Sequence, residues 1–226
     1  MELNNPKYHN QGIHLVASLF TIDKGILKVL LIKRKNLPFK GMWALVGGAL
    51  YNDEEVMTGM SREVKEKTGI TNIHLELFDV FSKVDRCKEM RMVALAHIGI
   101  VDKEKVSIMK ETLKTSNCDW FPLDNIPALA YDHNEILHEA IDVLKRRIKE
   151  TDFLRYMYPD GFTMPEIQKV YESILNKKFD RRNFRKKLLS LGLIEETNIL
   201  EKFDGNKPAK VYRFKEQNLS LIHISE

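Results

Sequence analysis

Residues 48–70, GALYNDEEVMTGMSREVKEKTGI, carry the strongest evidence for the fold of the N-terminal part of this chain. Apolar residues recur at helical spacing over residues 52–68, and Gly69 follows where a helix ends. Glu63 and Glu66 are three residues apart and therefore lie on one face of the predicted helix. Carboxylate oxygens are the ligands that Mg²⁺ prefers, so this face is a candidate metal site.

The same stretch matches a known signature at all but one of its fixed positions. The matching residues are Gly48, Glu54, Arg62, Glu63, Val64, Glu66, Gly69 and Ile70. A match of this quality arises by chance in roughly one in 10⁵ chains of this length. The stretch therefore resembles a Nudix box, which implies an α/β/α sandwich in which Mg²⁺ bridges a diphosphate and helps a water molecule attack it.

The resemblance assigns a role to most of the box. Glu63 and Glu66 are the candidate metal ligands and catalytic carboxylates. Arg62 and Glu54 are expected to brace the loop against the helix by pairing, and they complete the catalytic set. Gly48 lets the backbone approach a metal ion or a phosphate.

Lys67 departs from the signature, because it stands where the family has its last Glu. An ammonium four residues after Glu63 can pair with that carboxylate, so affinity for Mg²⁺ should fall, while the fixed cation can still attract a diphosphate. Glu111 and Asp132 stay open as substitute acids. We therefore expect weak Mg²⁺ binding that a regulatory role does not require, and we leave open whether hydrolysis persists.

The segments around the box complete an α/β pattern. Residues 13–20 and 26–33 predict a hairpin, and two further strands are expected over 72–82 and 90–101. A helix follows over 133–150. Asn52 or Asp53 is the expected cap of the box helix. Together with the box helix these elements predict a Nudix sandwich over residues 1–150 that serves as a ligand-sensing domain.

Flanking segments supply candidate ligand contacts. The run LLIKRKNLPFKGMWALVGGAL at residues 30–50, Asp85-Arg86 with Arg91, and Ala130-Tyr131-Asp132-His133 resemble the Nudix branch that includes ADP-ribose pyrophosphatases and their regulatory relatives. Arginines suit phosphate or ribose, and aromatic rings suit adenine. The ligand-binding candidates are Gly48, Arg34, Trp43, Lys67, Arg86, Arg91 and His133, with Phe39 and Tyr131 as further stacking candidates. His133 is equally well explained as a helix-start residue.

A second pattern begins after Glu150 and extends over residues 151–218. Thr163-Met164-Pro165-Glu166 is a capping box, Asn176 ends the first helix, and Asp180 caps a second helix that Gly192 stops. Two strands over 193–200 and 210–215 flank a turn at 204–207. Helix, turn, helix and hairpin in this order predict a winged helix-turn-helix domain.

The second helix of this domain carries most of its charge. Residues 151–218 have a net charge of +4, against +1 for residues 1–150, and residues 177–187 hold seven cations and one anion. Such a run suits a polyanion, although a charged run by itself is also typical of a solvated helix face. The DNA-binding candidates are Arg181, Arg182, Asn183, Arg185, Lys186, Lys187, Lys207 and Lys210. Arg182, Asn183 and Lys186 are expected on the groove side and the others mainly at phosphates.

Composition sets the remaining expectations. The chain has two cysteines in no metal-binding spacing, no signal peptide and no apolar run long enough for a bilayer, so a cytoplasmic protein without membrane partners is expected. Residues 219–226 (LSLIHISE) resemble a translated sequencing adapter and are treated as an artefactual tail.

Taken whole, the chain resembles the Nudix-related transcriptional regulators of the NrtR family. The resemblance implies a homodimeric repressor that binds double-stranded operator DNA and releases it when the Nudix domain binds ADP-ribose or, in some members, a sugar, with NAD-metabolism genes as targets. The alternative is a Mg²⁺-dependent Nudix hydrolase of ADP-ribose or a similar diphosphate, whose C-terminal domain is an accessory for dimer contacts.

Overall fold

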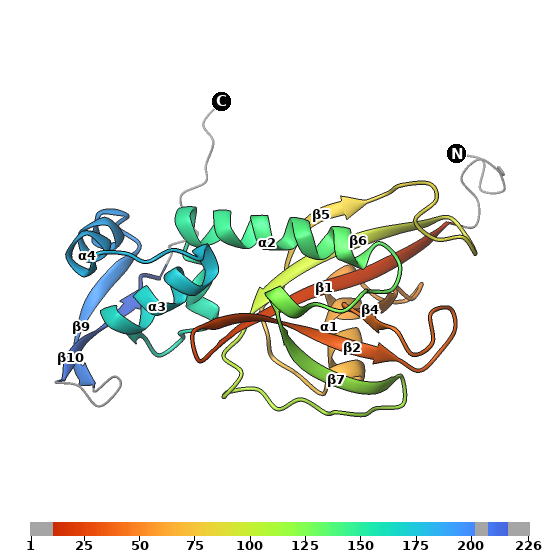
Figure 1. Ribbon diagram of the computed structural model, residues 1–226, viewed down its shortest axis with the longest axis horizontal. Coiled ribbons are helices and arrows are strands. Elements are labelled where there is room, and N and C mark those ends of the chain that lie inside the picture. Colours follow the sequence, from red (N-terminus) through yellow and green to blue (C-terminus); the bar gives the residue numbers. More distant parts are fainter. Residues whose placement is uncertain (1–10, 202–207, 217–226) are drawn as a thin grey trace. The chain divides into compact units, whose positions relative to one another are not determined.

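The computed structural model describes residues 11–201 and 208–216, and it divides into two compact units between Arg146 and Arg147. This division falls within a helix, slightly before the boundary predicted at Glu150. The predicted turn at residues 204–207 and the tail at 219–226 lie outside the described residues. Figure 1 shows the order of the elements along the chain.

A mixed sheet forms the centre of the first unit. Its strands are β1 (Gly12–Asp23), β2 (Ile26–Arg34), β3 (Trp43–Ala44), β4 (Val46–Ala49), β5 (Glu76–Phe81), β6 (Met92–Ile100) and β7 (Thr115–Pro122). Strand β1 is central, because it pairs antiparallel with β2 and β4 and parallel with β6. Lys24 and Gly25 have φ values of 50° and 78°, which lets the β1–β2 hairpin turn within two residues.

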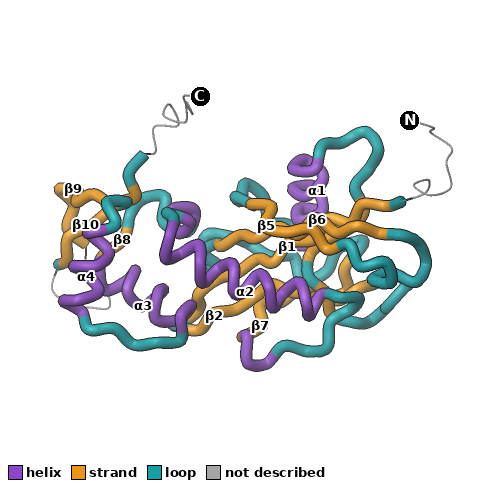
Figure 2. Tube along the Cα trace, turned by 90° about the horizontal axis from the view of Figure 1, so that it is seen from above, coloured by secondary structure: helices purple, strands orange, loops and turns teal. Residues whose placement is uncertain are grey.

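Two helices cover this sheet on opposite faces, α1 (Val56–Thr68) and α2 (His133–Glu150), as Figure 2 shows. A short 3₁₀ turn, η1 (Leu123–Asn125), precedes α2. The predicted stop of α1 is confirmed, since Gly69 adopts φ 79°. Its predicted cap is wrong, because the helix starts at Val56 and Glu55 occupies the cap position without a side-chain hydrogen bond.

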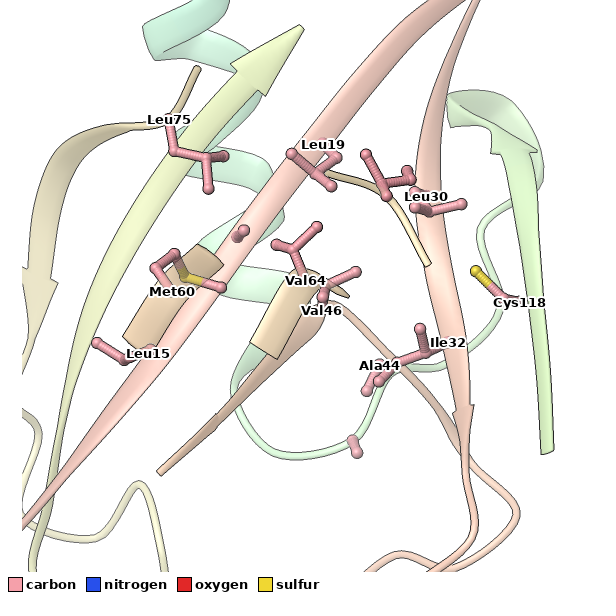
Figure 3. Packing of buried hydrophobic residues seen from close by; sticks show 13 residues of the cluster. Leu15, Leu19, Leu30, Ile32, Ala44, Val46, Met60, Val64, Leu75 and Cys118 are labelled. Atoms are coloured by element: carbon pink, nitrogen blue, oxygen red, sulfur yellow. The ribbon is translucent and has the colours of Figure 1, made fainter. Parts of the chain in front are cut away.

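The main core lies between α1 and the sheet. Met60 and Val64 of α1 pack against Leu15 and Leu19 of β1 and against neighbouring strands (Figure 3). Alternation along β1 turns its other residues, such as Phe20, toward the face that α2 covers. Burial of its apolar residues thus holds the box helix against the sheet. The charged residues of the helix are not part of this core.

The second unit has the predicted order of a winged helix domain. A 3₁₀ turn η2 (Phe153–Tyr156) leads into β8 (Phe162–Thr163), α3 (Met164–Leu175), α4 (Arg181–Ser190), β9 (Ile194–Glu201) and β10 (Ala209–Phe214). The strands form a sheet in the order β8-β10-β9. The capping box of α3 is confirmed, with both the Thr163 and the Glu166 side chains bonded to backbone N–H groups.

Two strand predictions differ from the structure at their ends. The strand expected over 72–82 begins at Glu76, because Asn72 adopts φ 56° and turns the chain before pairing can start. The strand expected over 90–101 is β6, which begins at Met92. The short β8 strand was not predicted. In the part of the chain that the structure describes, no helix combines the length and apolar character needed to cross a bilayer.

Candidate functional site

Arg62 organises the box. Its guanidinium donates two hydrogen bonds to Glu54, of 2.8 Å and 2.6 Å, and a third of 3.0 Å to the carbonyl of Ala49. It also lies 2.5 Å from Oε1 of Glu63. Glu54 in turn accepts from the backbone N–H of Tyr51, and the hydrogen bonds from Arg62 lower its pKa to about 2. The pairing expected between Arg62 and Glu54 is present, and it fixes the loop of residues 50–55 against α1.

Lys67 lies next to the carboxylate of Glu63, as its position in the sequence predicts. Its ammonium lies 3.0 Å from Oε2 of Glu63 and donates a hydrogen bond to the carbonyl of Gly47. Both charged groups are buried. Burial lowers the pKa of Lys67, and the neighbouring Glu63 carboxylate acts in the opposite direction. The ammonium therefore takes two oxygen ligands that a cation at this site would use.

Gly48 makes room for this arrangement. A Cβ atom there would lie 2.3 Å from Oε2 of Glu63. The space that sequence analysis reserved for a metal ion or a phosphate is filled by the Glu63 carboxylate itself.

Lys114 neutralises the second box carboxylate, which sequence analysis did not foresee. Its ammonium lies 2.6 Å from Oε2 of Glu66, although the two residues are 48 positions apart. This hydrogen bond lowers the pKa of Glu66 and raises that of Lys114. A lone lysine in the segment between two strands carries no sequence signal, so the tertiary fold was needed to find it.

The residues of the box do not fit a divalent metal in this arrangement. Glu54, Glu63 and Glu66 are matched by Arg62, Lys67 and Lys114, so the cluster has no excess negative charge. The substitute acids are also engaged. Asp132 accepts two hydrogen bonds of 2.8 Å from Arg86, and Glu111 lies 2.8 Å from Lys35. Among residues 11–201 and 208–216, no group of three or more His, Cys, Asp or Glu is placed to hold a metal ion.

An aromatic cluster is assembled from three segments of the first unit. The rings of His14 and His133 stack with centroids 5.5 Å apart, and Tyr131 contacts both. Phe39 meets Tyr131 edge-on at 4.6 Å, and the Arg34 guanidinium lies 5.1 Å from the centre of the Tyr131 ring. The loop carrying Phe39, strand β1 and the start of α2 thus meet at one place.

His133 holds a donor in this cluster without a recorded partner. Its Nδ1 accepts a hydrogen bond of 3.0 Å from the backbone N–H of Leu45, which leaves the proton of the neutral ring on Nε2. Within the described residues, this buried Nε2 has no hydrogen-bond partner. A buried donor without a partner is unfavourable unless a ligand or water satisfies it, so the atom is a candidate contact.

Positive charge converges on the two imidazoles. Burial, and after it the charges of Arg86, Lys67 and Arg34, lower the pKa of His14 to about 3. The pKa of His133 is lowered by burial and then by His14 and the same cations. Both rings are therefore neutral at physiological pH, and the box lysine belongs to the same electrostatic environment as the aromatic cluster. This setting favours an anionic group over a cationic one.

The other predicted ligand contacts have structural partners. The Arg86 side chain is 1% exposed and is held by Asp132, so it joins the segment after β5 to the start of α2. Arg91 donates to the carbonyls of Lys83 and Met92. Trp43 packs edge-on against Phe121, with ring centroids 4.6 Å apart. Of the predicted contacts outside the box, the structure brings Arg34 and His133 together with the two stacking candidates, Phe39 and Tyr131.

Helix α4 presents a basic face. Arg181, Arg182, Asn183, Arg185, Lys186 and Lys187 are all exposed, while Phe184 and Leu188 are buried. Asp180 caps the helix as predicted, by accepting from the backbone N–H of Asn183. Within the described residues, no acidic side chain forms an ion pair with Arg181, Arg182, Lys186 or Lys187. These cations are available to a polyanion.

Arg185 is connected to the wing. It donates a hydrogen bond of 3.0 Å to the hydroxyl of Tyr212 on β10, and that hydroxyl donates to Glu196 at 3.2 Å. Lys210 also pairs with Glu196. Arg185, Tyr212 and Lys210 border a cleft of about 850 Å³ between α3, α4 and the wing, which Arg181 also lines. Lys207 lies outside the described residues.

Comparison with known proteins matches each unit to a domain family. Residues 12–142 match the NUDIX domain, and residues 154–214 match the NrtR DNA-binding winged helix domain. The chain is 30% identical over 201 residues to an ADPR-responsive transcriptional repressor of Acinetobacter baylyi, covering 87% of this chain and 79% of that protein.

Solved structures agree with this assignment. The crystal structure of Shewanella oneidensis NrtR complexed with a 27mer DNA has a TM-score of 0.76 and 26% identity, covering 90% of this chain and 93% of that one. The NUDIX domain of the same protein, complexed with ADP ribose, has a TM-score of 0.57 and 28% identity, covering 62% of this chain and 93% of that one.

Proposed function

Because this chain belongs to the NrtR family, in which a NUDIX domain is joined to an NrtR DNA-binding winged helix domain, we propose that it is a transcriptional repressor that releases its operator on binding ADP-ribose. The DNA-binding unit is the second compact unit, which begins at Arg147, and the sensor is the NUDIX unit. The family assignment and the fold agree with the prediction from sequence.

The observation that carries this proposal is the exposed basic face of α4. Four of its cations have no acidic partner among the described residues, and Asn183 is exposed beside them. Arginine forks onto guanine and asparagine onto adenine, so Arg182 and Asn183 are assigned to base edges. Arg181, Arg185, Lys187 and Lys210 are assigned to phosphates, which carry most of the affinity.

The NUDIX unit supports an anionic effector. The donor at Nε2 of His133, the Arg34 guanidinium above Tyr131, and the exposed ring of Phe39 surround one place on the unit. A phosphate group suits the first two, and a base or ribose suits the aromatic rings. The relative from Acinetobacter baylyi responds to ADPR, which makes ADP-ribose the first effector to test.

Helix α2 supplies a route between ligand and DNA. It runs without a break from His133 in the aromatic cluster to Glu150, a span of about 25 Å at the rise of an α-helix. Near its end, the carbonyl of Ile148 accepts a hydrogen bond of 2.5 Å from the hydroxyl of Tyr171 on α3. A shift at His133 is thereby passed to the helix that supports α4.

Three further assignments complete the proposal. The protein acts in the cytoplasm, where its operator is. It binds as a homodimer, because helix-turn-helix proteins commonly read two half-sites of an operator as dimers. Hydrolysis of ADP-ribose is absent or very slow, since both box carboxylates are neutralised; turnover near ~1 s⁻¹, ordinary for an enzyme, would instead favour a Nudix hydrolase.

The deciding experiment is a DNA mobility-shift titration with the region upstream of the chain's own gene. Specific binding that ADP-ribose weakens, and that NAD or pentoses do not, is the expected result. Specific binding that only a pentose weakens would make the effector a sugar. Binding with no preference over unrelated DNA at the same salt concentration would contradict the proposal.

A further inference from the structure

Lys67 and Lys114 reach the two box carboxylates from different directions. Lys67 lies on α1 itself, one turn after Glu63, whereas Lys114 comes from the segment between β6 and β7. Each ammonium contacts one carboxylate, at 3.0 Å and 2.6 Å respectively. Both carboxylates are therefore paired. The pair of Glu66 does not involve Lys67, the residue that departs from the signature.

The segment that carries Lys114 is fixed at several points. The backbone N–H of Met109 donates a hydrogen bond of 2.7 Å to the carbonyl of Thr68, at the end of α1. Lys35 donates to the carbonyl of Thr112. Lys114 itself also lies 3.4 Å from the hydroxyl of Tyr51, whose ring the Arg62 guanidinium covers at 3.8 Å. An exposed ion pair usually contributes little, but here the backbone holds the lysine in place before it pairs.

The charge of the box explains what the two lysines do. A divalent cation in a Nudix box balances carboxylates that would otherwise repel the diphosphate of the ligand. Here Arg62, Lys67 and Lys114 already balance Glu54, Glu63 and Glu66. A metal ion would have to displace two ammonium groups, one of them buried, and would gain no excess negative charge.

We infer that the box of this chain is a metal-free anion site, in which Lys67 and Lys114 together do the neutralising work of divalent cations, so that a nucleoside diphosphate binds equally well without metal. The inference rests on the proposed function for the identity of the ligand. The absence of a metal site, by contrast, does not depend on the proposed function. Lys114, whose side chain is 36% exposed, is the lysine of the pair that a ligand can reach from solvent, whereas Lys67 is buried.

The test uses the full chain and two probes, Mn²⁺ alone and ADP-ribose. Calorimetry and the electron paramagnetic resonance signal of free Mn²⁺ should show no Mn²⁺ binding to the wild type. The affinity for ADP-ribose should agree within about twofold between EDTA and Mn²⁺ buffers, because no charge remains for the metal to balance. Binding of Mn²⁺ by the wild type, or a loss of ADP-ribose affinity of about tenfold or more in EDTA, would overturn the inference.

Variants test the role of the lysines directly. The double variant Lys67→Gln/Lys114→Gln leaves two carboxylate charges unbalanced, so it should bind Mn²⁺ and should lose ADP-ribose affinity in EDTA by about tenfold or more relative to Mn²⁺. Lys65→Gln removes the same charge from an exposed position of α1 and should behave as the wild type. A folded double variant that binds no Mn²⁺ would contradict the assignment.

Lys67 is buried, so the double variant is checked by circular dichroism. Should it fail to fold, Lys114→Gln alone decides, because Lys114 is partly exposed; it should show weaker but measurable Mn²⁺ binding, and none would overturn the inference. Failure of ADP-ribose to bind in either buffer would refute the proposed effector, and the Mn²⁺ measurements would still decide whether the box is free of metal.

Discussion

His14 and His133 are two neutral imidazoles stacked inside the first unit. Burial and the nearby charges of Arg86, Lys67 and Arg34 keep protons off both rings. The same charges suit a phosphate beside Nε2 of His133. The two rings therefore favour a neighbouring anion and disfavour any positive charge beyond those of the three cations.

Protonation of these rings should make stability depend on pH. In the unfolded chain a histidine titrates near pH 6.5, whereas the folded pKa of His14 is about 3 and that of His133 is also lowered. The unfolded state thus binds more protons below about pH 6.5, and the free energy of unfolding falls as the pH falls, by up to about 1.4 kcal/mol per pH unit for each ring. Urea unfolding on either side of pH 6.5 measures this slope.

His133→Asn provides the comparison, since the Asn side-chain oxygen can still accept from the backbone N–H of Leu45. The variant should lower the dependence of the free energy of unfolding on pH by the contribution of one histidine ring. Equal pH dependence in the wild type and in His133→Asn would show that the pKa of His133 is not lowered in the folded protein.

Base recognition is also decided by single residues. Arg182→Ala or Asn183→Ala should cost about 1–3 kcal/mol on the preferred operator and relax its sequence preference, because each removes a base-edge contact. Lys187→Ala should weaken all sequences alike and reduce the dependence on salt. Mobility shifts over a set of operator variants separate the two effects; unchanged specificity in both Arg182→Ala and Asn183→Ala would move the recognition surface elsewhere.

Helices α3 and α4 owe their positions to their caps. Thr163 and Glu166 bond reciprocally at the start of α3, and Asp180 caps α4. The exposed cations of α4 repel one another, so the helix depends on its cap and on the burial of Phe184 and Leu188. The basic surface of α4 is therefore stabilised by its cap and by its buried residues, and not by the charged side chains themselves.

Thr163→Ala should lower the free energy of unfolding by about 1 kcal/mol, within a usual range of about 0.5–2 kcal/mol, because the backbone N–H of Glu166 loses its acceptor. Ser190→Ala removes an exposed hydroxyl at the last residue of α4 and should change the free energy of unfolding by less than about 0.5 kcal/mol. Chemical denaturation of both variants gives the comparison. An equal cost for the two would mean that the capping box contributes nothing specific.

Regulation is a property of the whole molecule. A ligand changes DNA affinity only if it binds the free and DNA-bound proteins unequally. Helix α2 carries the proposed ligand contact His133 at one end, and near its other end the carbonyl of Ile148 accepts from the Tyr171 hydroxyl. The coupling should pass through this hydrogen bond.

Saturating ADP-ribose should weaken operator binding by roughly 5–150-fold in the wild type, the usual span of coupling energies. Tyr171→Phe should keep both binding reactions and lose most of the coupling, whereas Arg34→Ala should lose the response because it loses the ligand. Calorimetry for ADP-ribose and mobility shifts for DNA separate these cases. Full coupling in Tyr171→Phe would exclude this route.

Features that depend on near neighbours in the chain could be predicted from the sequence. The box helix, the pairing of Lys67 with Glu63, the capping box of α3 and the exposed and buried faces of α4 follow from spacings of three or four residues. The Nudix and winged-helix assignment follows from these local patterns. Both are confirmed.

Contacts between distant segments could be found only in the folded structure. Lys114 reaches Glu66 across 48 positions and Arg86 reaches Asp132 across 46, while His14 meets His133 from another element. No periodicity relates such residues, because the sheet register and the path of the loops bring them together. For the same reason the start of α1 was misplaced, since Glu54 is engaged by Arg62 and the helix begins after that loop.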